Sequence, residues 1–367
     1  MKAGPDQAAA AELAALRERI DALDLEILER LAARARLAVE VARAKARRGD
    51  ADFYRPEREA QVLRRLLERN PGPLEGEAVA RIFREIMSAC LALEQPITVA
   101  FLGPEGTYTQ EAVIKHFGHA VRTRPMVAID EVFREVEAGA ANYGVVPVEN
   151  SSEGVVNHTL DGFIESSLKI CGEVELPIHL NFLVGPRTDP QAISRVYAHP
   201  QALAQCRKWL DANYPGIERI PVSSNGEAAR RVKGEWNSAA IAGEMAMELY
   251  GLVRLWARIE DRPDNSTRFL VIGREVLPPS GDDKTSILVA TRNEPGALYA
   301  ILEPLRDHGI DMTRIETRPS PSGKWNYLFF IDFKGHVDEP PVRAALDEVR
   351  RRALDLKFLG SYPRAVL

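Results

Sequence analysis

The chain has 367 residues, of which 45% are hydrophobic and 28% are charged, and its formal net charge is −5. That length exceeds what one ordinary hydrophobic core can organise, so two or three domains are expected. The mild negative charge favours neither nucleic acid nor an anionic membrane as a partner. No apolar run approaches the ~20 residues needed to cross a bilayer.

The cysteines and the first residues of the chain bear on its compartment. Cys90, Cys171 and Cys206 are odd in number and widely spaced, so they form neither a disulfide framework nor a zinc pattern. Glu12 and Arg17 interrupt the alanine-rich start before the apolar segment of a signal peptide can form. We therefore expect a cytoplasmic protein, in which the Asn-X-Ser/Thr sequons beginning at positions 150, 157 and 265 do not carry sugars.

Residues 8–48 contain no Pro or Gly and predict one long amphipathic helix, ~60 Å at 1.5 Å per residue. Two further helices are predicted over residues 56–69 and 75–94, separated by the breaker NPGP. A unit of this size cannot cover so long a helix within one chain. The apolar stripe therefore predicts a homodimer; it consists of Leu13, Leu16, Ile20, Leu23, Ile27, Leu31, Ala38 and Val41.

Two cations, Arg34 and Lys45, fall within this apolar stripe. They are eleven residues apart, close to three helical turns, so they share a face. One interpretation is a pair of stripe-edge cations that extend to solvent or pair with Glu side chains. The other is a binding site. Arg17 lies ~25 Å from Arg34 along the helix axis, so it can meet the same small ligand only from a partner chain.

Three motifs of this region resemble the all-helical chorismate mutase family: LRERIDALDLEILERLAARARLAVEVARAK, YRPERE and IFREIMSACLALEQ. The resemblance covers a first domain of residues 1–95 and implies an intertwined dimer that rearranges chorismate to prephenate. It implies that Arg17 of the partner and Arg34 hold the substrate carboxylates and that Lys45 donates to the breaking ether oxygen. It also implies that Glu59 bonds the ring hydroxyl and that Arg58 supports the site.

The chain departs from the mutase pattern at three positions. Arg55 stands where some members have an acidic residue, and Cys90 stands where some have Ser. Glu94 occupies a position often held by Gln, one turn beyond Cys90 on the same face. These departures leave open a second interpretation, in which the mutase segment serves only as a dimerisation arm. Otherwise Cys90 and Glu94 belong to the chorismate site, with Glu94 facing the ether oxygen.

From residue 97 onward, short apolar runs alternate with helical patterns, which predicts an α/β domain with a largely parallel sheet. Polar clusters follow several of these runs, where open α/β sheets bind ligands. The predicted strands are 98–102, 143–148, 180–184, 195–198, 239–242 and 269–272.

Five motifs, in order, resemble prephenate dehydratase: GPEGTYTQEA, VPVENSSEG, HPQALAQC, AAIAGEMAMELYGL and NSTRF. The resemblance covers a domain of residues 97–275 and implies a two-lobed fold like that of periplasmic binding proteins, with prephenate in the cleft. The implied reaction expels the ring hydroxyl as water and the ring carboxylate as CO2, giving phenylpyruvate. Since aromatisation drives it, the protein must orient the carboxylates and assist the departing hydroxyl.

The dehydratase resemblance also implies residue roles. Thr267 is expected to hydrogen-bond the leaving group, Arg268 to hold a carboxylate, and Phe269 to pack. Asn150 and Gln205 are expected to orient the substrate by hydrogen bonds, and Thr107 with the Gly103–Gly106 turn to seat a carboxylate. Ala198 stands where some members have Ser, and we interpret His199 as a structural turn residue rather than the acid. The sequons at 150 and 265 are thus incidental to an active-site cluster.

A Pro/Gly/Asp linker precedes residues 285–362, whose pattern predicts the order βαββαβ of a ferredoxin-like module. The predicted strands are 285–292, 311–318, 325–333 and 356–362, and the predicted helices are 297–308 and 339–352. The module resembles the ACT regulatory domain, which implies phenylalanine as effector. The implied effector residues are Gly296, Ala297, Leu298, Glu316, Thr317, Arg318 and Pro319.

The order of the three resemblances is that of the bifunctional chorismate mutase/prephenate dehydratase family of phenylalanine biosynthesis. This implies a multidomain enzyme acting on chorismate and prephenate, inhibited by phenylalanine, with no cofactor and no metal. Two alternatives stay open. One is a monofunctional dehydratase with a mutase-derived dimerisation arm. The other is a non-catalytic sensor of small anions or amino acids.

Overall fold

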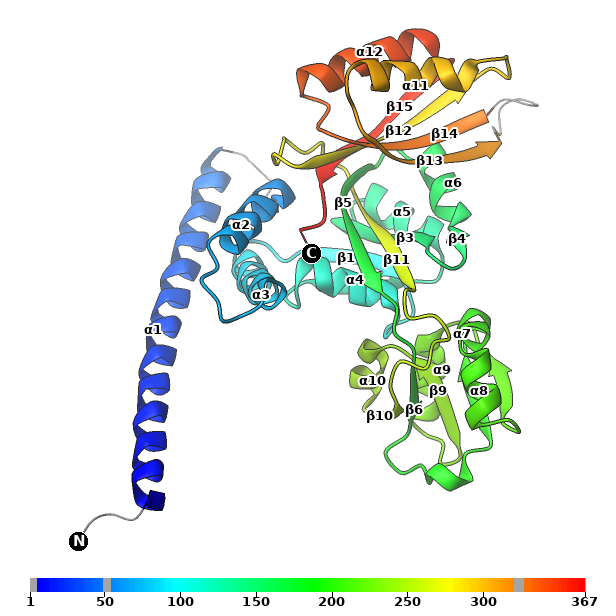
Figure 1. The fold of residues 1–367 in the computed structure, drawn as a ribbon. Coiled ribbons are helices and arrows are strands. Elements are labelled where there is room, and N and C mark those ends of the chain that lie inside the picture. Colours follow the sequence, from blue (N-terminus) through cyan, green and yellow to red (C-terminus); the bar gives the residue numbers. More distant parts are fainter. Residues whose placement is uncertain (1–4, 49–53, 320–326, 367) are drawn as a thin grey trace.

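The computed structural model describes residues 5–48, 54–319 and 327–366. Figure 1 shows three units in chain order: a helical unit, a two-lobed α/β unit, and a sheet covered by two helices. The all-α, α/β and ferredoxin-like classes predicted from the sequence are confirmed. In the part of the chain that the structure describes, no helix is both long enough and apolar enough to cross a membrane.

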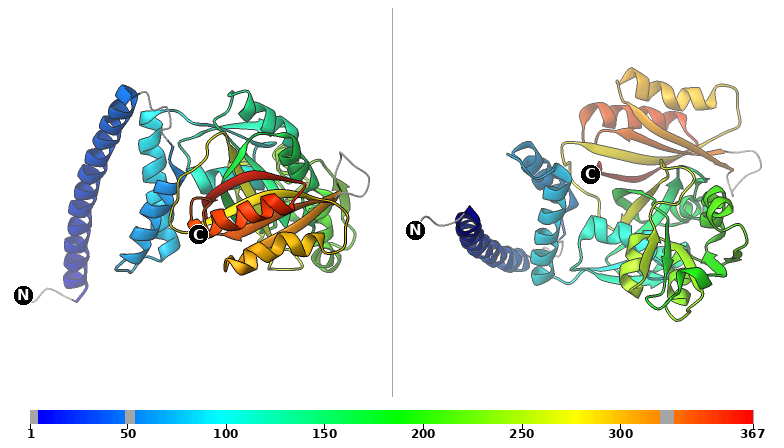
Figure 2. Two further views of the ribbon diagram at one scale, coloured as in Figure 1. Left: turned by 90° about the horizontal axis from the view of Figure 1, so that it is seen from above. Right: turned by 60° about the horizontal axis from the view of Figure 1, so that its bottom comes forward.

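The helical unit consists of α1 (Pro5–Arg48), α2 (Pro56–Glu68) and α3 (Gly76–Glu94), as predicted to within a few residues. α1 packs against α3 near its C-terminal end, and its N-terminal half extends away from the rest of the chain (Figures 1 and 2). Leu13, Leu16, Ile20 and Leu23 are each about half exposed, at 47–56%. An apolar stripe that is left uncovered on an amphipathic helix is expected to pack against another surface.

The first lobe of the α/β unit is built on a sheet with strand order β2-β1-β3-β11-β5, and β4 pairs with β3. The first-lobe helices are α4 (Tyr108–Phe117), α5 (Ile129–Glu137) and α6 (Asn157–Glu165). The strands are β1 (Thr98–Leu102), β2 (Arg122–Met126), β3 (Tyr143–Asn150), β4 (Gly154–Val155), β5 (Lys169–Pro177) and β11 (Ser266–Gly273).

The second lobe has strand order β10-β6-β9-β7-β8. The chain enters it after β5 and returns to the first lobe through β11, so two segments cross between the lobes. The strands are β6 (Asn181–Val184), β7 (Arg195–Ala198), β8 (Glu218–Pro221), β9 (Ser238–Ala242) and β10 (Val253–Trp256). The helices are α7 (Pro200–Gln205), α8 (Arg207–Asn213), α9 (Asn225–Val232) and α10 (Glu244–Tyr250), with a 3₁₀ turn at Pro190–Ala192.

The prediction of a largely parallel sheet was wrong in part, because both sheets are mixed. β1 runs parallel to β2 and β3, but β11 runs antiparallel to both β3 and β5. The antiparallel pairing follows from the connections between the lobes. The chain leaves the first lobe after β5 and returns to it through β11, which runs beside β5 in the opposite direction. In the second sheet, β7 is parallel to β8 and β9, whereas β6 is antiparallel to β9 and β10.

The third unit has the predicted βαββαβ order and a fully antiparallel sheet, β13-β14-β12-β15. Its elements are β12 (Asp283–Thr291), α11 (Ala297–Asp307), β13 (Met312–Pro319), β14 (Tyr327–Lys334), α12 (Pro340–Arg352) and β15 (Asp355–Pro363). The start predicted for the third strand, residue 325, lies outside the described residues. On β12, Ile287 and Val289 pack with the helices, whereas the intervening Leu288 packs with the first lobe. The sheet therefore lies between its own helices and the first lobe.

Candidate active sites

The helical unit forms a cavity of about 700 Å³ between α1, α2 and α3. The predicted chorismate residues that line it are Arg34 and Lys45 from α1, Arg58 and Glu59 from α2, and Cys90 and Glu94 from α3. Arg17 is not among its lining residues. It is exposed on the part of α1 that extends from the molecule, so this cavity can receive it only from another copy of the chain.

Glu59 and Glu94 both have raised pKa values because they are partly removed from water. Burial raises the pKa of Glu59 to about 7, against the opposing effect of the Arg84 and Arg34 guanidinium groups. Burial also raises the pKa of Glu94, against Lys45 and Arg34. The sequence left open whether burial or Lys45 has the larger effect on the pKa of Glu94, and in the structure the effect of burial is larger. Both carboxyl groups can therefore hold a proton at a higher pH than an exposed Glu.

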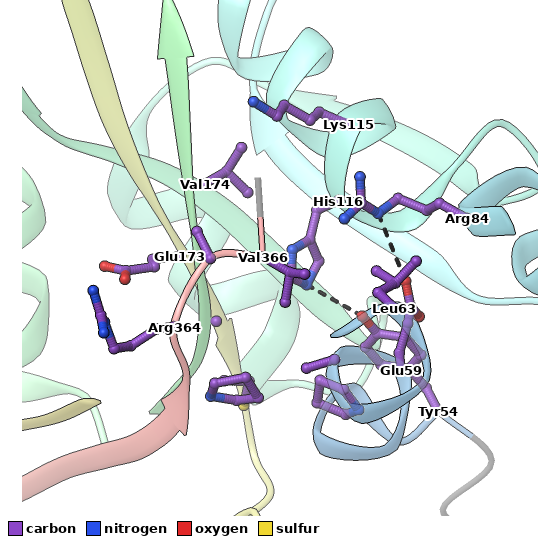
Figure 3. Close-up of a pocket in the computed structure, with 16 residues that line it drawn as sticks. Tyr54, Glu59, Leu63, Arg84, Lys115, His116, Glu173, Val174, Arg364 and Val366 are labelled. Atoms are coloured by element: carbon purple, nitrogen blue, oxygen red, sulfur yellow. Dashed lines mark hydrogen bonds and ion pairs between the residues drawn. The ribbon is translucent and has the colours of Figure 1, made fainter. Parts of the chain in front are cut away.

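A second, smaller cavity of about 50 Å³ lies directly behind Glu59, where α2, α4, β5 and the C-terminal residues Pro363–Val366 meet (Figure 3). Tyr54 and Glu59 line both this cavity and the larger one, so they form the wall between them. Arg84 approaches Glu59 with its Nε at 3.7 Å. Residues of α4 and β5 line the other side of the small cavity, so the α/β unit supports this wall of the larger cavity.

Tyr54 and His116 join the helical unit to α4 of the first lobe. The Tyr54 hydroxyl is hydrogen-bonded to His116 Nε2 at 3.2 Å, as Figure 3 shows. Burial, with a smaller effect from Arg84, lowers the pKa of His116 to about 3, and burial raises the pKa of Tyr54 well above its usual value. Both groups are therefore neutral at physiological pH. Sequence reasoning missed this pair, since no local motif connects residues 62 positions apart.

Between the two lobes of the α/β unit lies a cleft of about 710 Å³. Thr267 and Phe269 of β11 line it, as does Thr107 before α4, in agreement with their predicted places. His199 lines it from the second lobe, where its main-chain N–H donates to Asn225 Oδ1 at 2.9 Å, which fits a structural turn. Burial lowers the pKa of His199.

The predicted carboxylate seat at Thr107 is partly occupied by the protein itself. Thr107 Oγ1 donates within its own turn, with the carbonyls of Pro104 at 3.0 Å and Leu102 at 3.3 Å. The Gly103 N–H donates to the Met126 carbonyl, and the Gly106 N–H to Gln110 Oε1 at 2.7 Å. The turn uses these groups to hold its own shape, and the carboxylate seat at Thr107 stays a prediction. The turn still shapes the cleft.

Thr267 belongs to a cluster of amide side chains at the lobe boundary. Thr267 and Asn150 are register partners on β11 and β3, and Asn150 Nδ2 donates to Thr267 Oγ1 at 2.8 Å. Asn265, which is only 3% exposed, connects Asn150 to Gln205. Asn150 and Gln205 are not among the residues that line the cleft. Asn150 is connected to it through its hydrogen bond to Thr267, and Gln205 through Asn265 and Asn150. Asn157, the remaining sequon, begins α6 and is exposed.

Arg268 does not lie in the cleft, and its predicted role as a carboxylate ligand was wrong. Side chains alternate along a strand, so Arg268 points away from the face that Thr267 and Phe269 present to the cleft. Its guanidinium donates to Glu173 Oε2 at 3.0 Å, Asp332 Oδ2 at 2.8 Å and the Tyr362 hydroxyl at 3.2 Å. Arg268 therefore holds the third unit onto β11, directly behind the cleft.

The predicted effector residues lie at one end of the third unit's sheet. Gly296, with φ 83°, caps α11, and Ala297 and Leu298 begin that helix. Glu316, Thr317, Arg318 and Pro319 end β13. The two groups share an end because Tyr327 of β14 pairs with both Thr291 and Pro319. Two adjacent strand spacings, about 10 Å, separate β12 from β13.

The third unit is also bonded to the first lobe by two arginines of β13. Arg318 bonds Asp161 of α6 at 2.6 Å, and Arg314 bonds Glu149 at 2.9 Å, next to Asn150 on β3. Arg314 thus connects β13 to the residue next to Asn150, which belongs to the cluster around Thr267. Among the described residues, no group of three or more His, Cys, Asp and Glu side chains is arranged to hold a metal.

Comparison with known families assigns each unit. Family models match residues 16–95 (chorismate mutase type II), 99–276 (prephenate dehydratase) and 285–351 (ACT domain). A bifunctional chorismate mutase/prephenate dehydratase of Pseudomonas aeruginosa is 63% identical over 97% of this chain and 99% of its own. One from Neisseria gonorrhoeae is 50% identical over 96% and 97%.

A solved structure extends the comparison to the fold. Prephenate dehydratase from Arthrobacter aurescens, in complex with L-Phe, superimposes with a TM-score of 0.68 at 35% identity. The match covers 73% of this chain and 90% of that one. The α/β unit and the sheet-and-helix unit together therefore share a known arrangement.

Proposed function

The chain belongs to the bifunctional chorismate mutase/prephenate dehydratase family, and from that membership we propose how its residues divide the chemistry. The enzyme rearranges chorismate to prephenate, then converts prephenate to phenylpyruvate, CO2 and water, and phenylalanine inhibits it. We propose residues 1–95 for the mutase, 97–275 for the dehydratase and 285–362 for regulation. A cytoplasmic location is part of the proposal, supported by three cysteines that are all buried and unpaired.

The mutase step breaks a C–O bond and forms a C–C bond within one molecule, so the protein contributes positioning and charge stabilisation. In the proposal, Arg34 and Arg17 of a second copy hold the two carboxylates, and Lys45 donates to the ether oxygen as negative charge develops there. Glu59 bonds the ring hydroxyl, and protonated Glu94 donates a second hydrogen bond to the ether oxygen. The observation that supports this set is that Arg34, Lys45, Glu59 and Glu94 line one cavity, whereas Arg17 is exposed on the extended part of α1.

The mutase assignment therefore includes a homodimer. Its support is the half-exposed apolar stripe of α1 and the position of Arg17, ~25 Å along that helix from Arg34. A second α1 packed on the stripe would cover the apolar side chains and bring its own Arg17 to the cavity. Cys90 and Arg58 line the same cavity and are proposed to shape it.

The dehydratase step breaks the bond from the ring to its carboxylate, which leaves as CO2, and the electron pair enters the ring. Hydroxide departs from the opposite carbon and is released as water after gaining a proton. We assign Thr267 to the departing hydroxyl, with Phe269 packing against the ring and Thr107 at the cleft wall. Asn150 is assigned to orient Thr267, on the strength of the 2.8 Å hydrogen bond between them.

Phenylalanine is proposed to bind at the sheet end formed by Gly296, Ala297 and Leu298 with Glu316, Thr317, Arg318 and Pro319. The contacts from β13 to Glu149 and Asp161 support a route from that end to the dehydratase cleft. The test of the whole proposal is incubation of purified protein with chorismate, following prephenate and phenylpyruvate separately, with and without phenylalanine. Formation of neither product would exclude catalysis and favour a sensor. Conversion of added prephenate alone would identify a dehydratase with a dimerisation arm.

A further inference from the structure

Asn265 holds together the segments that meet at the dehydratase cleft. It lies on the segment that returns from β10 to β11, and its main-chain carbonyl accepts from Ile178 N, on the outgoing segment, at 2.8 Å. Its side-chain Nδ2 donates to Gln205 Oε1 at 3.1 Å, at the end of α7 in the second lobe. Its Oδ1 accepts from Asn150 Nδ2 at 3.0 Å, in the first lobe.

Two main-chain groups set the direction of the hydrogen bonds that join Asn150 to Thr267 and Asn265. The N–H groups of Ser152 and Glu153 can only donate, and both point at Asn150 Oδ1, at 2.9 and 3.1 Å. The Nδ2 of Asn150 must therefore face Asn265 and Thr267. Asn265 consequently turns its oxygen to Asn150 and its nitrogen to Gln205.

This directionality fixes what the Thr267 hydroxyl can do. An amide nitrogen does not accept hydrogen bonds, so Thr267 Oγ1 receives a hydrogen from Asn150 and keeps its own. Among the residues that the structure describes, Asn150 is the hydrogen-bond partner of Thr267 Oγ1. Since Thr267 lines the cleft, its hydrogen is left for an acceptor there, such as the oxygen of a departing hydroxyl.

We propose that Asn265 is a positioning residue of the dehydratase, which sets the direction of this hydrogen-bonded chain and so orients the Thr267 hydroxyl. Asn150 Nδ2 has two hydrogens and three acceptors nearby: Thr267 Oγ1, Asn265 Oδ1 and the Ser266 carbonyl at 3.2 Å. Asn265 Oδ1 accepts one of these two hydrogens, so that Asn150 Nδ2 donates the other to Thr267 Oγ1. The inference rests on the proposed role of Thr267 and adds the group that aligns it.

Asn265→Asp tests the direction of the chain, because it replaces the donor NH2 by an oxygen; the charge that it also adds is matched by a control variant. The ionised carboxylate still accepts from Asn150 but places an oxygen against Gln205 Oε1. Once protonated, it can donate to Gln205 as Asn does. Charged groups on the surrounding segments include Glu149 on β3 and Glu153 after it, the paired His179 and Glu260 on the two connecting segments, Asp261, Arg262 and Asp264 on its own loop, and His199 before α7. They are mostly acidic, which with burial favours a raised pKa for the new carboxyl.

The measurement is prephenate turnover of the full-length protein from about pH 5.5 to 8.5, expressed as the ratio to wild type, which cancels titrations common to both. At alkaline pH, Asn265→Asp is expected to lower kcat by about tenfold to a hundredfold with KM within about twofold, as one misdirected buried hydrogen bond implies. The ratio should rise toward one as pH falls. Asn142→Asp adds the same charge in the same lobe and keeps the acceptor for Thr98 N, so its ratio should stay near one at every pH.

A second variant covers the case in which Asn265→Asp does not fold. Asn265→Ser is too short to reach Asn150 and Gln205 together, so kcat should fall at every pH with little change in KM. Wild-type kcat in either variant, or a loss in Asn265→Asp that does not change with pH, would overturn the inference. Thr267→Ala is measured alongside. If that variant remains active, the proposed role of Thr267 fails; if it is inactive while Asn265 variants are normal, only the role of Asn265 fails.

Discussion

The Tyr54 hydroxyl lies 3.2 Å from His116 Nε2 and joins the mutase domain to helix α4 of the dehydratase domain. Both residues are part of a continuous aromatic cluster with Phe117 and Tyr143. Tyr54 also lines the cavity proposed for chorismate, beside Glu59. The wall of the proposed mutase site is thus anchored in the core of the other domain.

Tyr54→Phe is expected to reduce the free energy of unfolding by about 1–3 kcal/mol, because it leaves the buried His116 nitrogen without its partner. The mutase rate should fall modestly and the dehydratase rate should not change. Urea unfolding and both activity assays provide the measurement. Tyr299→Phe, which removes an exposed hydroxyl bonded to Glu303, is the matched control. It should change neither the free energy of unfolding nor the two activities. Equal stability of the two variants would contradict the anchoring role.

Glu94→Gln is expected to extend mutase activity to higher pH. Burial raises the pKa of Glu94, so below that pKa the carboxyl is protonated and donates to the ether oxygen. As pH rises through it, the donor is lost and a negative charge appears beside developing negative charge, so kcat/KM falls. Glutamine donates at every pH. Glu59, with its pKa raised to about 7, titrates in both proteins, so only the difference between the profiles reports Glu94. Superimposable profiles would remove Glu94 from this role.

Arg268→Met is expected to destabilise the protein by about 3–5 kcal/mol, because it leaves Glu173 and Asp332 facing a buried site without their shared cation. Lys284 remains near Glu173, so that carboxylate keeps one partner. Thermal unfolding measures the loss. Arg268→Lys should recover part of the stability with an unchanged KM for prephenate. A large rise in KM in the folded Lys variant would instead return Arg268 to substrate binding.

Glu316→Gln is expected to weaken phenylalanine inhibition while leaving uninhibited turnover intact. Deleting the regulatory domain is a poorer test, because Leu288, Leu328, Leu359 and Tyr362 belong to the core of the first lobe. Removing them would expose that core and lower stability for reasons unrelated to the effector. Titration of dehydratase activity with phenylalanine measures the effect. Wild-type inhibition in this variant would place the effector elsewhere.

The order and class of the domains could be predicted because they depend on local patterns. The 3.6-residue period over residues 8–48 and the NPGP breaker were sufficient for the helices, and the βαββαβ order followed from its linker. The strand β2, with sequence RTRPM, was missed because it has almost no apolar residues and is held by pairing with β1. Such strands are defined by their neighbours rather than by their own sequence.

The site was predicted unevenly for a similar reason. Thr267 and Phe269 were found by motif, but Arg268 was misassigned although the two-residue period of a strand places it on the opposite face. That signal was present in the sequence. The roles of Asn265, Tyr54 and His116 depend on contacts between distant segments and on burial, which one sequence does not contain.

The most direct test of the account is Thr267→Ala supplied with chorismate at neutral pH. Thr267 lines the cleft proposed for the dehydratase and not the cavity proposed for the mutase, which lies in a separate domain. Chorismate should therefore be consumed at the wild-type rate, and prephenate should accumulate while phenylpyruvate is nearly absent. Wild-type protein under the same conditions should pass prephenate on to phenylpyruvate. Phenylpyruvate formation by Thr267→Ala at near the wild-type rate would contradict the assignment of this residue to the departing hydroxyl.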